Sequence, residues 1–186
     1  MACASYSDVS SIGKTRSVLS SARPTGADLY IGQLIFETNT KRLLIHDGTG
    51  WIILQEPWQS YATTLTQGVG VTFVTAVSEY QRRNGMCFWR GRIAATSAGT
   101  SGQPVLATLP AGGSTEIGVP VGSGLIFDLS AAQRYVSTVE AGSSADKMGW
   151  GPDGTSTFWG SAPSIALASG DILTWAVEFK MASAYS

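Results

Sequence analysis

The chain has 186 residues, of which 13% are charged, and its formal net charge at pH 7 is -1. This charge excludes the basic surface with which nucleic-acid-binding proteins neutralise phosphates. A charged fraction far below the roughly 25% of ordinary soluble domains, together with 22 glycines, favours turn-rich β structure and a surface that copies of the same chain cover.

The sequence also predicts a chain that is made in the cytoplasm and does not insert into a membrane. No stretch approaches the roughly 18 consecutive apolar residues that a membrane span requires. Residues 1–8 lack the basic start and the continuous apolar run of a signal peptide.

Residues 1–25 predict an N-terminal docking arm. The segment is rich in serine and has too few aliphatic residues to close a core. An N-cap at Ser10 or Ser11 favours a short helix over residues 10–20, which Gly13 interrupts and Arg23 and Pro24 end. We expect a partner subunit to order this arm.

Residues 26–56 predict a small β-meander. Three short apolar strands are separated by turns at residues 39–41 and 47–50, whose Asn, Asp and Gly residues tolerate positive φ or bond their own backbone. A sheet of this size is marginal in isolation, so we expect it to serve oligomerisation or attachment. The side chains expected to form its apolar face are Leu34, Phe36, Leu44 and Trp51.

Residues 57–186 predict a C-terminal antiparallel β-sandwich of jelly-roll type, which makes the whole chain all-β. Pro57 marks the boundary, because proline lacks a ladder donor. The Asn84–Gly85 pair predicts a hairpin turn, and the alternation over residues 172–180 predicts a core strand. The predicted strands are 71–82, 86–95, 105–109, 124–129, 135–140, 155–159 and 172–180.

Residues that could carry catalysis or bind a metal are sparse. His46 is the only histidine, and Asp47, its neighbour on a strand, should point to the opposite face. One histidine with two separated cysteines, Cys3 and Cys87, provides neither a zinc site nor a disulfide. We therefore expect no catalytic residue, no metal and no cofactor. The acidic residues formally available for sugar hydrolysis form no paired motif, and they are Asp128, Glu140, Asp146, Asp153 and Asp171.

The turn-rich segment 147–159 carries the candidate ligand site. It places Trp150 and Trp159 on either side of Asp153. Aromatic faces beside short polar groups can stack on sugar rings and hydrogen-bond their hydroxyls. Two interpretations stay open, a glycan-binding loop or aromatic packing in the core or between subunits.

Residues 23–51, RPTGADLYIGQLIFETNTKRLLIHDGTGW, resemble a recurrent element of tailed-bacteriophage structural proteins. In that element Arg-Pro precedes Gly-Gln, a strand with Glu-Thr follows, and Asp-Gly comes before Trp. The runs WQSY at 58–61, YQRRNG at 80–85 and LATLPAG at 106–112 resemble the C-terminal β-sandwich of the same virion proteins. The resemblance implies a homotrimer, with the meander near the threefold axis and the sandwiches of residues 57–186 displayed outward. It also implies that the N-terminal arm docks onto the major capsid protein or onto tail or baseplate proteins.

The expected function is therefore that of a non-enzymatic structural protein on the virion surface. It would be a capsid decoration protein or head spike, or a short tail-fibre tip that binds host surface polysaccharide. The lack of a coiled-coil or repeat shaft favours a short knob. The alternative is a polysaccharide-degrading tail-spike enzyme.

Overall fold

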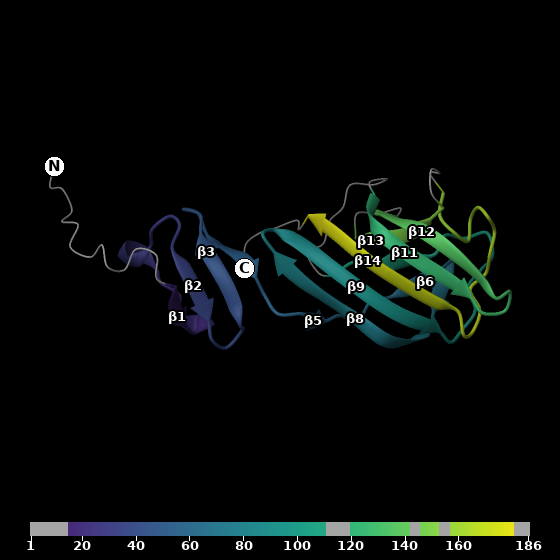
Figure 1. Ribbon diagram of the computed structural model, residues 1–186, viewed down its shortest axis with the longest axis horizontal. Helices are drawn as coiled ribbons and strands as arrows, with labels where there is room; N and C mark the ends of the chain where they lie inside the picture. Colours follow the sequence, from purple (N-terminus) through teal and green to yellow (C-terminus); the bar gives the residue numbers. More distant parts are fainter. Residues whose placement is uncertain (1–14, 111–119, 142–145, 153–156, 181–186) are drawn as a thin grey trace.

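The computed structural model describes residues 15–110, 120–141, 146–152 and 157–180. It confirms an all-β chain, with a small and a large sheet following one another along an elongated molecule (Figure 1). Its elements are β1 (Arg16–Val18), η2 (Ser20–Ala22), η3 (Gly26–Asp28), β2 (Leu34–Glu37), β3 (Arg42–His46), β4 (Trp51–Gln55), β5 (Gln59–Ser60), β6 (Leu65–Gln67), β7 (Val69–Val71), β8 (Phe73–Arg83), β9 (Met86–Ala95), β10 (Leu106–Thr108), β11 (Pro120–Asp128), β12 (Gln133–Ala141), β13 (Lys147–Gly151) and β14 (Ile172–Lys180).

The predicted meander is present as strands β2, β3 and β4 of the small sheet. Its first turn contains Lys41 at a φ of 59°, and its second contains Gly48 at a φ of 103°. The side chain of Asp47 accepts hydrogen bonds from the backbone N–H groups of Thr49 and Gly50, at 2.8 and 2.9 Å. These bonds are the local turn chemistry that the sequence predicts.

The end of the arm is part of the same sheet. Strand β1 pairs in parallel with β2, and Val18 packs against the small-sheet core. The predicted helix is therefore wrong over residues 15–20, where the chain forms β1 and starts η2. Residues 1–14 lie outside the described residues. A strand forms here because β2 offers it an unpaired edge, and the segment's own sequence does not reveal that edge.

The small sheet has apolar side chains on both faces, which corrects the predicted single face. Ile35 pairs with Leu44 and Leu44 with Ile53, and side chains of paired residues point to the same side. Together with Trp51 these residues form a buried cluster on what we call the covered face. Leu34 and Phe36 alternate with Ile35 and therefore lie on the opposite, outer face. The predicted grouping of Leu34, Phe36, Leu44 and Trp51 on one face is therefore wrong, because Leu44 and Trp51 lie on the covered face and Leu34 and Phe36 on the outer face.

A buried carboxylate, Glu37, ties the arm to the covered face. Its side chain accepts a hydrogen bond from Arg23 Nε at 2.5 Å and another from the hydroxyl of Thr40. Burial opposes ionisation, but these hydrogen bonds and the charges of Arg23 and Arg42 outweigh it and lower the pKa of Glu37. The ionised carboxylate therefore stabilises the small sheet.

Acidification should remove this stabilisation. Because the pKa is lower in the folded chain, the contribution is present above the ordinary value of 4.5 and is lost as the pH falls through the folded value. We expect the melting temperature of wild type to exceed that of Glu37→Gln at pH 7, with the gap closing as the pH falls below 4.5. Circular dichroism melts from pH 7 to 3 measure this gap. A gap independent of pH would contradict the assignment.

The large sheet has the strand order β5-β8-β9-β14-β11-β12-β13-β10-β6-β7. Strands β7 and β8 stand near opposite ends of this order, yet only Thr72 separates them in sequence. The sheet must therefore curl until its ends approach each other, which is consistent with a β-sandwich. The strand order does not confirm the jelly-roll type.

Two of the predicted large-sheet strands, β9 and β14, have the predicted bounds. The predicted hairpin turn is also confirmed, since Asn84 and Gly85 have φ angles of 52° and 76°. The predicted strand at 155–159 is wrong in its described part, residues 157–159, which form no strand, and the strand of that region is β13.

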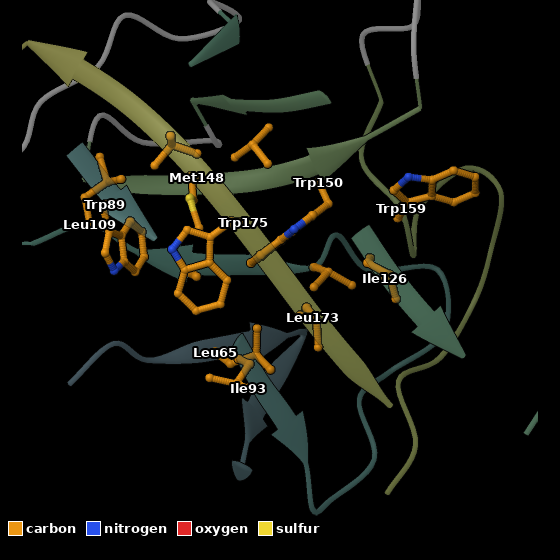
Figure 2. Packing of buried hydrophobic residues seen from close by; sticks show 14 of the residues in the cluster. Leu65, Trp89, Ile93, Leu109, Ile126, Met148, Trp150, Trp159, Leu173 and Trp175 are labelled. Carbon is orange, nitrogen blue, oxygen red and sulfur yellow. The ribbon is translucent and has the colours of Figure 1, made fainter. Parts of the chain in front are cut away.

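Three tryptophans form the centre of the large-sheet core. Trp175 of β14 lies between Trp89 and Trp150, with ring centroids 4.9 and 5.9 Å away in edge-to-face contacts (Figure 2). Trp175 pairs with a glycine on each side, Gly91 of β9 and Gly124 of β11. The indoles need this space, because a Cβ at Gly91 would lie 2.1 Å from Cζ2 of Trp175.

Candidate functional site

The outer face of the small sheet is the most prominent candidate for binding. Its residues follow from the strand register, in which Leu34, Ile45 and Ile52 are cross-strand neighbours and Phe36 pairs with Leu43. All five side chains are half-buried, whereas the covered face is closed by Val18 and Leu29. We call these five residues the outer apolar face.

A groove of about 470 Å³ lies between this face and the connection at Glu56 and Pro57. Phe36 and Leu43 of the outer apolar face line it, together with Lys41, Glu56 and Pro57. Its lining is mainly apolar and it opens to solvent.

The two sheets are joined by a buried ionic junction centred on Glu56. The Glu56 side chain is fully buried and contacts Arg42 Nε of the small sheet at 3.1 Å. It also accepts hydrogen bonds from Arg82 Nε and Nη2 of the large sheet, at 2.8 and 3.0 Å. Burial alone would lower the pKa of Arg82, but the hydrogen bond and charge of Glu56 outweigh it and raise that pKa. The predicted boundary at Pro57 thus lies beside a tight connection.

Backbone contacts reinforce this junction. The Glu56 N–H donates to the Arg82 carbonyl at 3.2 Å, and the Asn84 N–H donates to the Ile53 carbonyl at the same distance. The side chain of Gln81 also donates to the Glu56 carbonyl. The β8–β9 hairpin therefore holds the small sheet at a defined position.

Trp150 and Trp159 do not form the predicted glycan-binding loop, because both are buried. Trp150 is fully buried and its indole N–H donates to the Thr174 carbonyl at 3.0 Å, while Trp159 is 9% exposed and packs on Tyr135. Neither ring offers a free face to a sugar, so core packing describes both. Asp153 lies outside the described residues.

Three further residues considered for catalysis, His46, Asp128 and Asp171, take part in core packing or in local hydrogen bonds to the backbone. His46 is buried on the covered face, where its ring packs edge-on against Trp51 at 5.2 Å. Asp128 accepts hydrogen bonds from Ser130 and from the N–H of Ala131, which lowers its pKa, as a turn residue should. Asp171 is buried and bonds the N–H groups of Leu129 and Ala168.

The cysteine in the large sheet is a core residue. Cys87 is free and fully buried, and burial together with the charge of Glu56 raises its pKa to about 12. Within the described ranges, no group of three or more His, Cys, Asp or Glu side chains could hold a metal ion.

Sequence reasoning missed the partners of Glu56 and the side of the sheet on which each apolar residue lies. The first left no local signal, because Arg42 and Arg82 are far from Glu56 in sequence. The second left no signal either, because the two-residue alternation places Ile35 on the same face as the charged Glu37, which by itself predicts that this face is exposed.

No protein-family model, curated protein or solved structure matches this chain. Among the described residues, no helix has the length and apolar character needed to cross a membrane.

Proposed function

We propose that this chain is a non-enzymatic structural protein of a tailed-phage particle that assembles as a homotrimer through its small sheet. The observation that carries the proposal is the outer apolar face, five half-buried apolar side chains on a sheet whose other face is already covered. Contiguous apolar surface of this kind marks interaction sites. The low charged fraction of the chain also favours a surface covered by its own copies.

In this proposal the parts of the chain have separate tasks. The N-terminal arm docks onto the major capsid protein or onto tail or baseplate proteins, and the small sheet joins the copies. The rigid junction at Glu56 then holds the large sheet outward as a knob on the virion surface. The trimeric state and the docking partners come from the sequence resemblance.

The two faces of the small sheet give a sharp test. We expect Phe36→Glu to weaken self-association about 100-fold or more while leaving the fold intact, because an unpaired carboxylate would be buried between copies. Trp51→Glu should instead unfold the small sheet, because Trp51 belongs to the covered core. Light scattering after size exclusion measures the first effect, and thermal melts measure the second.

The matched control is Val136→Glu, which places the same charge on a 68% exposed valine of the large sheet. It should change neither the oligomer nor the melting temperature. A chain that is monomeric at high concentration, or an oligomer that Phe36→Glu leaves intact, would refute the proposed assembly.

Quantitative mass spectrometry of purified particles tests the virion role. Hundreds of copies per particle indicate a capsid decoration protein or head spike, and a few to a few dozen indicate a tail position. No copies in particles would contradict the proposal. Release of reducing sugar ends from host capsule by the purified protein would favour the tail-spike enzyme instead.

A further inference from the structure

A second groove, of about 460 Å³, lies on the large sheet where β9, β14 and β11 run side by side. The register pairs Phe88 with Glu178 and Arg90 with Ala176, so these four side chains share one face. Ala176 has only a methyl group and Gly122 has no side chain, so these two residues form the floor of the groove. The larger side chains of Trp58, Phe88, Arg90 and Glu178 form its walls.

The walls combine an exposed aromatic ring with oriented polar groups. Trp58, which is 40% exposed, lines the groove on the side of β5 and β8. The guanidinium carbon of Arg90 lies 4.4 Å from the centroid of the Trp58 ring. Arg90 Nε and Nη2 both donate to Glu79 Oε1, at 2.8 and 2.5 Å. Arg90 is thus held in place from two sides, and its planar group has further N–H donors to offer a ligand.

The charges of the groove restrict the ligand class. Arg90 and Glu178 are the charged residues of the lining, so its formal charges balance, and Arg90 is also paired with Glu79 beside the groove. A ligand without net charge therefore suits the groove better than an acidic one. A ligand that suits the groove has an apolar face for the aromatic rings of Trp58 and Phe88, acceptors for Arg90 and donors for Glu178.

We propose that this groove binds a short segment of a neutral polysaccharide. A sugar ring presents a C–H face for aromatic packing, and its hydroxyls both donate and accept hydrogen bonds. The volume lies within the roughly 300–1,000 Å³ of small-molecule sites. This site differs from the loop predicted at Trp150 and Trp159, whose rings are buried. The inference extends the proposed function by naming a ligand class, but sugar binding can be tested without any virion.

The test uses the full chain and a panel of immobilised hexasaccharides, neutral ones (cellohexaose, maltohexaose, mannohexaose, chitohexaose) and acidic hexagalacturonate. We expect binding to at least one neutral probe and none to hexagalacturonate. Titration of that probe, followed by isothermal calorimetry or saturation-transfer NMR, then gives the affinity. Binding to no neutral probe, or only to the acidic one, would overturn the proposal.

Variants of the groove locate the binding. Ala176→Phe fills the floor and Trp58→Ala removes the aromatic wall, and each should weaken binding at least tenfold, while Trp58→Phe should retain most of it. Val136→Phe, which adds the same ring at an exposed outward position of β12, is the control and should have no effect. Thermal melts confirm that each variant is folded.

Two other outcomes would also overturn this assignment. Unchanged sugar affinity in both groove variants would place the ligand elsewhere. A loss of self-association in Ala176→Phe, with sugar affinity unchanged, would assign the groove to contacts between copies. Phe36→Glu separates the two proposals, because it should disrupt the oligomer without abolishing sugar binding by each copy.

Discussion

Replacing Glu56 with alanine is expected to cost about 3–5 kcal/mol of unfolding free energy, the usual effect of removing one partner from a buried ion pair. The fully buried carboxylate faces Arg42 on one sheet and Arg82 on the other. Its removal leaves two partly buried guanidinium groups that repel each other. For a chain of this size the loss corresponds to a fall in melting temperature of about 10 °C.

Urea denaturation followed by circular dichroism measures this effect. Glu79→Ala is the matched control, because the Glu79–Arg90 pair is more exposed and surface pairs contribute about 0–1 kcal/mol. Replacing Glu56, Arg42 and Arg82 together with methionine should recover much of the stability, since no charge is then left unpaired. A Glu56→Ala variant within 1 kcal/mol of wild type would show that the junction is not a stabilising contact.

The Gly91→Ala substitution should destabilise the large sheet by about 3 kcal/mol, at the upper end of ordinary overpacking effects. The added methyl group would lie 2.1 Å from Cζ2 of Trp175, a separation that no relaxed structure permits. Trp175 cannot move aside freely because Trp89 and Trp150 hold it on two sides. The strain must therefore spread through the tryptophan core.

Gly70→Ala provides the control for this prediction. Gly70 also lies in a strand, but a Cβ there meets no atom within 4 Å, so its substitution should change stability by less than 1 kcal/mol. In a double-mutant cycle, Trp175→Phe should relieve part of the Gly91→Ala cost, because phenylalanine lacks the outer indole atoms that clash. Additive effects of the two substitutions would argue against a direct clash.

The comparison of sequence and structure is most instructive at β13. The sequence places Lys147–Gly151, with its two glycines, in the turn-rich segment 147–159, whereas the folded chain forms strand β13 there. In the folded chain Phe158 packs onto the backbone at Gly149, where a Cβ would lie 2.5 Å from its ring. Gly149 therefore makes room for the ring of Phe158, nine residues further along the chain, and single-sequence patterns do not distinguish such a glycine from a turn glycine.

Local sequence by itself determined the all-β class, the meander turns, the Asn84–Gly85 hairpin and the bounds of β9 and β14. These features depend on the φ preferences of individual residues and on alternation along one strand, which are properties of sequence neighbours. Only the tertiary structure decided which face of the small sheet is covered, that Trp150 and Trp159 are buried, and that Glu56 joins the two sheets. Burial and ion pairing depend on segments far apart in the chain, and one-residue differences in register reverse which side chains they cover.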